Sequence, residues 1–175
     1  MIWFTSDLHL NHRAVVGMCE RPFESVEEMN EVLIRNFNER VKKNDTVYIL
    51  GDIAHRTPVI EANNLIRKLN GKKILCKGNH DKRYDPSLFE GIYDFLEIAV
   101  NGMNLSLMHY PMMSWPKSRY GSIHLHGHIH SKGDYNMQQK SEDTLRYDVG
   151  VDANLFCPVS IEEIKAFLFI DGVLL

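Results

Sequence analysis

The chain has 175 residues, of which 44% are hydrophobic and 25% are charged, and its formal net charge is −3 at pH 7. This length and composition predict a single globular domain over residues 1–175 with a sizeable apolar core. The slightly acidic balance argues against a broad polyanion-binding surface, so long nucleic acid is not an expected partner.

The cysteine content and the hydropathy of the chain indicate the cellular compartment. The three cysteines, Cys19, Cys76 and Cys157, are odd in number and show no paired spacing, which indicates a reduced protein rather than a disulfide scaffold. The first ten residues, MIWFTSDLHL, lack a basic leader, and no apolar stretch approaches the roughly 20 residues that a membrane span requires. We therefore expect a cytoplasmic protein without a membrane partner. The sequence gives no expectation for its oligomeric state.

Apolar strands and amphipathic helices alternate along the first half of the chain. The clearest helix is predicted over residues 25–41, because Ser25 and Glu28 fit a capping box ahead of an apolar stripe. Thr57 and Pro58 fit the cap and the first position of a second helix. Strands are predicted at residues 2–6, 46–50 and 72–77.

The second half reads as hairpins and short strands. Asn101-Gly102 predicts a type I′ turn between strands at 95–100 and 103–109, and further strands are predicted at 122–126 and 145–151. The polar residues 131–141 predict a loop, and Ser160 with Glu163 predicts a short capped helix. The last segment, FLFIDGVLL (167–175), fits a closing strand or hairpin, or an interface. This mixture indicates an α/β fold with mixed sheets layered between helices.

Five of the predicted strands end in residues that bind metals or move protons. The carboxyl ends of strands are where open α/β sheets build their sites, so these five ends are expected to meet in one crevice. Any one of them alone would be a weak signal, whereas five in series are a strong one. They are Asp7-Leu8-His9, Gly51-Asp52, Gly78-Asn79-His80-Asp81, His109-Tyr110-Pro111 and Gly127-His128-Ile129-His130.

The residue types at these ends indicate the metal chemistry. Seven side chains offer carboxylate, imidazole or amide ligands: Asp7, His9, Asp52, Asn79, His109, His128 and His130. A mixed oxygen and nitrogen set favours borderline divalent ions, with Mn²⁺ preferred and Fe²⁺, Zn²⁺, Ni²⁺ or Co²⁺ as alternatives. Seven ligands are too many for one tetrahedral zinc ion and enough for two ions that share a carboxylate. A pair about 3.5–4 Å apart suits in-line displacement at phosphorus by a bridging hydroxide.

In their order along the chain, these five blocks resemble the calcineurin-like metallophosphoesterase superfamily. The short chain and the stretches SDLHLNH and HYPMMSW also resemble its small, stand-alone bacterial and phage members. The resemblance implies two mixed β-sheets forming a sandwich core flanked by helices, with a dimetal site at the carboxyl ends of the strands. It further implies a division of the ligands. Asp7, His9, Asp52 and His130 would hold the first metal, Asp52 would bridge, and Asn79, His109 and His128 would complete the second.

The resemblance also implies roles for residues that are not ligands. His80 would be the general acid or the donor to a phosphoryl oxygen, and Asp81 would orient its imidazole, although Asp81 could equally cap the following turn. His12 and Arg119 are candidates for substrate contact, with local packing and solvation as equally good alternatives. His55 is better explained by a solvated turn than by a place at the pocket mouth.

Four histidines alternate along residues 124–130, and Gly127 divides them. His124 and His126 lie on the predicted strand, where we expect them to support the site from below. His128 and His130 lie beyond the strand and are expected to reach one metal each.

The sequence therefore predicts a dinuclear metal-dependent phosphoesterase, with a small nucleotide-type phosphodiester favoured as substrate. Alternatives are a phosphomonoesterase or a nuclease on the same centre, and a binding scaffold that retains the fold without turnover. The presence of His80 and of all seven ligands favours the enzyme over the scaffold.

Overall fold

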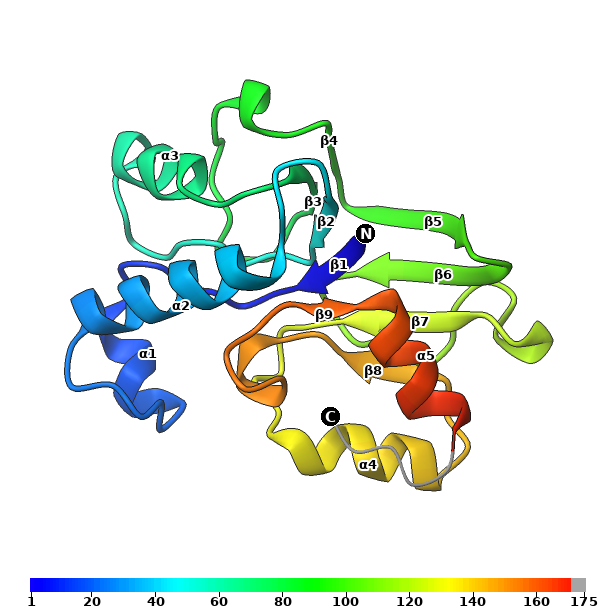
Figure 1. Cartoon of the computed structure of the whole chain (residues 1–175). Helices are drawn as coiled ribbons and strands as arrows, with labels where there is room; N and C mark the ends of the chain where they lie inside the picture. The colour runs from blue at the N-terminus through cyan, green and yellow to red at the C-terminus, as the bar shows by residue number, and fades with distance from the viewer. Residues whose placement is uncertain (171–175) are drawn as a thin grey trace.

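A computed structural model describes residues 1–170, and it contains two β-sheets with helices around them (Figure 1). The first sheet has five strands in the order β4-β3-β2-β1-β9. Its first four members are parallel, and β9 pairs antiparallel to β1. The strands are β1 (Ile2–Thr5), β2 (Thr46–Ile49), β3 (Lys72–Cys76), β4 (Gly91–Tyr93) and β9 (Val159–Ser160).

The second sheet has four strands in the order β5-β6-β7-β8. These are β5 (Phe95–Val100), β6 (Met103–Met108), β7 (Ile123–His126) and β8 (Arg146–Asp148). The pair β5-β6 is antiparallel and the others are parallel, so this sheet is also mixed. Asn101 and Gly102 both have positive φ, 49° and 79°, which confirms the predicted type I′ hairpin. The predicted fold class is therefore confirmed.

Five helices and three short 3₁₀ turns complete the described chain. The helices are α1 (Arg13–Met18), α2 (Val26–Arg40), α3 (Val59–Arg67), α4 (Gly133–Ser141) and α5 (Ile161–Phe169). The 3₁₀ turns are η1 (Pro86–Leu88), η2 (Ser118–Tyr120) and η3 (Val151–Ala153). The Ser25 hydroxyl caps α2 by accepting from the amide of Glu28 at 3.1 Å, as predicted. The helix α3 begins one residue later than expected, with Pro58 as its N-cap.

Two apolar clusters hold these layers together. The first packs α1, α2 and α3 against one face of the five-stranded sheet, with Val15, Phe37 and Ile66 beside Trp3 and Ile49. The second lies between the two sheets and includes Phe4, Cys76, Leu107 and Leu125, with α5 contributing Phe167. Because β1 places Trp3 in one cluster and Phe4 in the other, the five-stranded sheet is buried on both faces.

The predicted loop over residues 131–141 is wrong, because most of this segment forms α4. The buried positions of this helix are polar, so the sequence lacks the apolar stripe that would predict a helix here. The side chain of Asn136 donates to the carbonyl of Asp148 and accepts from its amide, at 3.0 and 2.8 Å. Gln139 accepts from the guanidinium of Arg146. The helix therefore binds the sheet through hydrogen bonds rather than through apolar packing.

The closing strand or hairpin predicted for residues 167–175 is also wrong for the part that the structure describes. The helix α5 continues to Phe169, which is 53% exposed, and a capping box between Ser160 and Glu163 starts it as predicted. Leu174 and Leu175 lie outside the described residues. None of the described helices is both long and apolar enough to cross a membrane.

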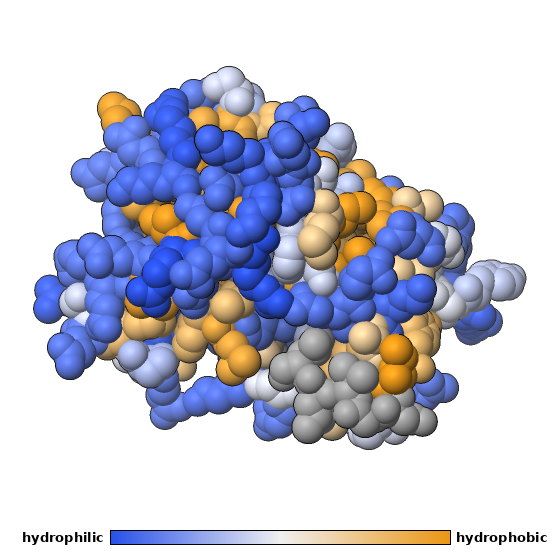
Figure 2. Space-filling model, in the orientation of Figure 1, coloured by the Kyte–Doolittle hydropathy of each residue, from blue (hydrophilic) through white to orange (hydrophobic). Residues whose placement is uncertain are grey.

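The surface is polar where the interior is apolar. The face in Figure 2 is mostly hydrophilic, and its apolar residues form separate small areas. The candidate site residues of the sequence lie instead at the edge where parallel strands of both sheets end. An isolated parallel bridge between Ser6, after β1, and Gly150, after β8, joins the two sheets at this edge.

Candidate metal centre

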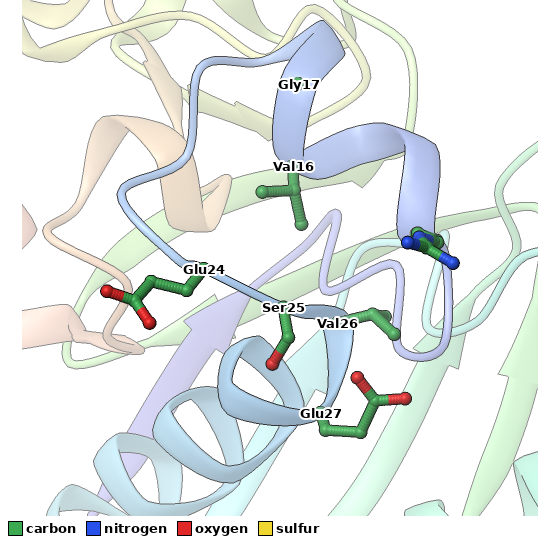
Figure 3. Close-up of a pocket in the computed structure, with 7 residues that line it drawn as sticks. Val16, Gly17, Glu24, Ser25, Val26 and Glu27 are labelled. Atoms are coloured by element: carbon green, nitrogen blue, oxygen red, sulfur yellow. The ribbon is translucent and has the colours of Figure 1, made fainter.

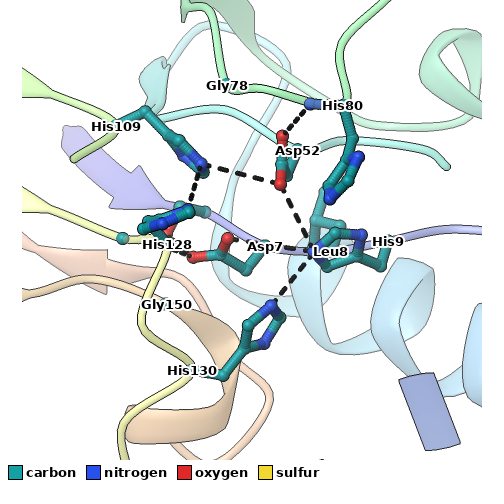
Figure 4. A network of polar contacts seen from close by, with 12 residues as sticks. Asp7, Leu8, His9, Asp52, Gly78, His80, His109, His128, His130 and Gly150 are labelled. Atoms are coloured by element: carbon teal, nitrogen blue, oxygen red, sulfur yellow. Dashed lines mark hydrogen bonds and ion pairs between the residues drawn. The ribbon is translucent and has the colours of Figure 1, made fainter. Parts of the chain in front are cut away.

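The turns after the strands bring the predicted ligands together at the edge shared by the two sheets (Figure 4). Asp7, His9 and His130 each offer a ligand atom within 4.8 Å of the others. Asp7, Asp52 and His109 form a second group of the same kind, so that Asp7 belongs to both. Four of these five residues are at most 2% exposed: Asp7, His9, Asp52 and His109.

The carboxylate of Asp52 lies between the two groups. Its Oδ2 atom is 3.5 Å from Nε2 of His9 and 3.6 Å from Nε2 of His109. Its Oδ1 atom accepts a hydrogen bond from the amide of His80 at 2.9 Å, which fixes the rotation of the carboxylate. One oxygen of Asp52 therefore faces ligands of both groups, as a bridging carboxylate must.

Asn79 and His128 extend the second group. Nε2 of His109 is 3.0 Å from Oδ1 of Asn79 and 3.2 Å from Nδ1 of His128. On the other side, Nε2 of His9 is 3.2 Å from Nε2 of His130. The seven predicted side chains are thus gathered in one continuous cluster.

Asp7 supplies the test of whether a cation fits. Its Oδ2 atom accepts from the hydroxyl of Ser6 at 2.6 Å and from the amide of His128 at 2.9 Å. Its Oδ1 atom is buried without a hydrogen-bond partner. Burial raises the pKa of Asp7 to about 6, against the opposing charges of His109 and His130. A buried carboxylate oxygen without a partner is costly, and a divalent cation would supply the missing charge.

Hydrogen bonds to one nitrogen of an imidazole leave the other free to bind a metal. Nδ1 of His109 is 2.8 Å from the carbonyl of Leu50, and Nδ1 of His130 is 2.8 Å from Oδ2 of Asp152. In the neutral form of each ring, these contacts leave the Nε2 lone pair facing the cluster. Burial, with the charge of His130, lowers the pKa of His9 to about 2, so this imidazole stays neutral as a ligand must.

The backbone of the ligands is strained. Five of the seven have φ in the left-handed region: Asp7 (58°), His9 (49°), Asp52 (55°), His128 (75°) and His130 (47°). For residues other than glycine this conformation costs about 1–3 kcal/mol each, and it persists only where the surroundings enforce it. These five residues follow only three strands, β1, β2 and β7, and this concentration of strain makes the edge a candidate functional site.

Glycines allow these turns to approach each other. A Cβ atom on Gly127 would clash with Asp7 and Ser6, and one on Gly78 would clash with Asp52. Gly51 has φ of 92°, and a Cβ there would lie 2.6 Å from Nδ1 of His109. The glycines beside the ligands are therefore required by close contact between the turns.

His80 lies beside the cluster, as expected, whereas the hydrogen bonds of Asp81 are made to groups other than the His80 imidazole. The His80 ring packs against the rings of His9 and His55, with centroids 5.6 and 3.9 Å apart. The carboxylate of Asp81 accepts from the amides of Asp52, Ile53 and Gly78 at 2.8–2.9 Å, and from the hydroxyl of Tyr84. Asp81 thus holds the turn that carries Asp52 against the turn after β3. This role is closer to the second prediction for Asp81, in which it caps a turn.

The two candidates for substrate contact lie in different places. His12 is next to the cluster, with its ring 5.5 Å from that of His9. Arg119 lies in η2, which precedes β7, whereas the ligands follow β7. It lines a separate cavity of about 400 Å³ with Trp115 and Leu145. The structure therefore does not bring Arg119 to the cluster, and its contact with a phosphate stays a prediction.

His124 and His126 are buried on β7 and bond to the chain around them. His124 accepts from the amide of Met112 at 3.0 Å and lies 2.9 Å from the carbonyl of Ser106. Nδ1 of His126 is 2.9 Å from the carbonyl of Gly127. Burial lowers the pKa of both imidazoles to about 4, so they support the turn as neutral groups.

A buried ion pair beside the candidate ligands was not predicted from the sequence. Arg21, 4% exposed, binds both oxygens of Asp152 at 2.8 Å and donates to the carbonyls of Asp7 and Leu8. Asp152 in turn holds His130. Asp152 directly follows the predicted strand at 145–151, so it could have been recognised as a sixth polar strand end. No sequence pattern identifies Arg21.

The residues present therefore fit a pair of divalent cations. The donor set is mixed oxygen and nitrogen, Asp7 keeps an unpartnered oxygen, and Asp52 faces both groups. A further group formed by Cys19, His130 and Asp152 fits a cation less well, because the guanidinium of Arg21 already occupies both oxygens of Asp152.

Comparisons with known proteins agree with this geometry. The family model described as calcineurin-like phosphoesterase matches residues 1–156. The uncharacterised protein MJ1445 of Methanocaldococcus jannaschii is 36% identical over 164 residues, covering 92% of this chain and 87% of that protein. The Gene 66 protein of Mycobacterium phage L5 is 29% identical over 160 residues, covering 74% of this chain and 77% of that protein.

Solved structures show the same fold. A protein of unknown function from Aquifex aeolicus, AQ665, matches with a TM-score of 0.74 and 28% identity, over 94% of this chain and 97% of that one. A novel archaeal phosphodiesterase matches with a TM-score of 0.50 and 19% identity, over 85% and 82%. The chain thus belongs to the calcineurin-like phosphoesterase family.

Proposed function

We propose that this protein is a dinuclear metal-dependent phosphodiesterase that hydrolyses a small, nucleotide-type phosphodiester. The observation that carries the proposal is the position of Asp52, whose Oδ2 atom lies 3.5 Å from Nε2 of His9 and 3.6 Å from Nε2 of His109. A single-metal site would leave part of this cluster without a role.

The ligands divide between two positions. Asp7, His9 and His130 would hold one cation, Asn79, His109 and His128 would hold the other, and Asp52 would be shared. Bound divalent cations would supply Lewis acidity towards the phosphoryl oxygens and a lowered pKa for a water molecule between them. We prefer Mn²⁺ for a set of carboxylates, imidazoles and one amide.

His80 would act on the substrate rather than on a metal. Its amide donates to Oδ1 of Asp52, and its half-buried ring packs between those of His9 and His55. This places an imidazole at the rim of the cluster, where it would donate a proton or a hydrogen bond to a phosphoryl or leaving-group oxygen.

The openness of the cluster supports a diester. Asn79 is exposed, and His80, His128 and His130 are half-buried, so the ligands reach the surface of the molecule. A phosphodiester carries a substituent on each side of the phosphorus and needs such an open approach. The archaeal phosphodiesterase with a TM-score of 0.50 shares the fold and is consistent with this preference.

Nitrophenol release from bis(p-nitrophenyl) phosphate tests the proposal. The metal-loaded protein should hydrolyse this diester faster than p-nitrophenyl phosphate, and removal of metal should abolish the reaction. Asp52→Asn should abolish turnover, while Asp134→Asn, an exposed position on α4, should not. Absence of hydrolysis across mono- and diesters by a protein with two bound ions would refute it, and a monoester preference would correct the substrate class.

A further inference from the structure

Three imidazoles that are not among the candidate ligands lie near His9. The ring centroids of His12, His55 and His80 lie 5.5, 6.2 and 5.6 Å from that of His9. They also pack on one another, with 3.9 Å between His80 and His55 and 4.3 Å between His55 and His12. The metal ligands therefore continue into a wall of imidazoles that neither cation position uses.

This wall does not present ligands for a third metal. Its rings pack edge to face, at 68° between His80 and His55 and 68° between His55 and His12. Within residues 1–170, the groups whose ligand atoms converge within 4.8 Å do not include these three histidines together. The three histidines therefore do not form a cation site of this kind.

The charge beside the wall is positive. Arg56 directly follows His55 in the chain and is exposed, so it places a guanidinium on the residue next to the wall. Burial lowers the pKa of both His12 and His55, and the charge of Arg56 contributes in the same direction. Nδ1 of His12 is buried without a hydrogen-bond partner. The wall thus offers one unpartnered polar ring atom and a guanidinium, which suit an anion.

The turn that carries Arg56 is fixed by its neighbours. The buried hydroxyl of Thr57 contacts the carbonyls of Leu10 and His55 at 3.3 and 3.0 Å, and the ammonium of Lys82 donates to the carbonyl of Thr57 at 2.9 Å. Arg56 itself has a left-handed backbone, with φ of 53°. These contacts therefore fix the backbone of Arg56, from which the guanidinium extends.

Arg13, the other arginine next to a wall histidine, is directed elsewhere. It lines a separate hollow of about 340 Å³ between α1 and the start of α2, whose other lining residues include Glu24 and Glu27 (Figure 3). The two carboxylates make that hollow a poor place for an anion. Of the two arginines that are next to a wall histidine in the sequence, Arg56 is the one that does not line this acidic hollow.

We propose that His12, His55 and Arg56 form a subsite for a second phosphate of the substrate, next to the phosphate that is hydrolysed. The inference rests on the proposed function, since it names the substrate class for the same centre: a nucleotide or short oligonucleotide that carries a phosphate beyond the scissile one. Arg56 would bind this phosphate by charge-assisted hydrogen bonds, and the imidazoles would supply a neutral polar surface.

A pair of aryl esters tests the subsite. One is the p-nitrophenyl ester of thymidine 5′-phosphate, and the other is the same ester with a phosphate on the 3′ oxygen. The native protein should show a kcat/KM about tenfold higher for the 3′-phosphorylated ester, the size expected of one charge-assisted contact. Arg56→Ala should bring this ratio close to one, Arg56→Lys should retain part of it, and Arg35→Ala, an exposed arginine on α2, should leave it unchanged.

A ratio near one in the native protein, or the full ratio in Arg56→Ala, would overturn the inference. A third ester, in which the 3′-phosphate joins a second nucleoside, identifies the source of the phosphate. Retention of the preference indicates an internal phosphate of an oligonucleotide, and its loss indicates a terminal phosphate. Both results require the subsite.

A binding measurement separates this inference from the proposed function. Calorimetry should show that thymidine 3′,5′-bisphosphate binds the metal-loaded protein about tenfold more tightly than thymidine 5′-monophosphate, and that Arg56→Ala removes the difference. If no ester is hydrolysed but this difference is present, the proposed function fails and the subsite stands. Equal binding of the two nucleotides overturns the subsite whatever the activity.

Discussion

At the scale of single residues, the candidate ligands share one arrangement. A hydrogen bond holds one polar atom of the side chain, and the other polar atom is left free to bind a cation. Asp7 and Asp52 each use one carboxylate oxygen to accept a backbone amide, from His128 and His80. The imidazoles of His109 and His130 each use Nδ1 in a fixed contact. This arrangement orients the free atoms before any cation binds, and so lowers the entropic cost of assembling the site.

The carboxylate of Asp152 should tune the first cation position through His130. Asp152→Asn weakens the fixed contact at Nδ1, so we expect metal affinity about 10–100-fold lower than in the native protein. Competition with a fluorescent chelator measures this affinity, with Asp134→Asn as the exposed control. Since Arg21 also loses an ionised partner, thermal unfolding should be recorded in parallel, and unchanged metal affinity would show that Asp152 serves the ion pair alone.

His80 should affect the chemical step without affecting the metals. Its ring packs on His9 and His55 rather than joining the contacts among the seven candidate ligands, so His80→Ala should lower kcat by about 10²–10⁴-fold while the affinity for Mn²⁺ stays the same. Steady-state kinetics on an aryl diester and a metal titration of the same preparation give the two values. A loss of metal binding in this variant would assign His80 to the ligand set instead.

At the scale of elements, the strand ends could be predicted because each apolar strand is followed at once by a polar ligand. The hairpin at Asn101-Gly102 and the cap at Ser25 were also visible, because both depend on local backbone preferences. The helix α4 was not, because its buried Asn136 and Gln139 give no apolar period. Arg21 was invisible for a similar reason, since its partner Asp152 lies 131 residues away.

The helix α5 offers a test of how one cap contributes to stability. Glu163 accepts from the amide and the hydroxyl of Ser160 and pairs with Arg40. Burial would raise the pKa of Glu163, but these hydrogen bonds and the charge of Arg40 outweigh it and lower the pKa below 4.5. A depressed carboxyl pKa stabilises the fold above the unfolded pKa, and this contribution is lost as the pH falls through the folded pKa.

Glu163→Gln should therefore lower the free energy of unfolding by about 0.5–1 kcal/mol at neutral pH, since Gln keeps the shape but loses the charge. Urea denaturation at neutral pH and at about pH 3 should show this difference shrinking as Glu163 becomes protonated. A difference that stays constant over this range would mean that the charge of Glu163 contributes nothing to stability.

At the scale of the whole molecule, the proposed metal centre lies where the two sheets meet. Asp7, His9, Asp52 and Asn79 follow strands of the first sheet, and His109, His128 and His130 follow strands of the second. Cations bound between these groups would bind the folded chain and not the unfolded one, so they should stabilise the packing of sheet on sheet. The apolar core between the sheets fixes the positions of the strands, and the strained turns at the strand ends carry the candidate ligands.

The central claim is that these seven side chains hold two ions that share Asp52. Equilibrium dialysis of the metal-free protein against Mn²⁺, followed by elemental analysis, tests it most directly. The structure predicts two ions per chain in the native protein and fewer than two in Asp52→Asn, because the shared oxygen faces both positions. One ion per chain at saturation, or none, would contradict it.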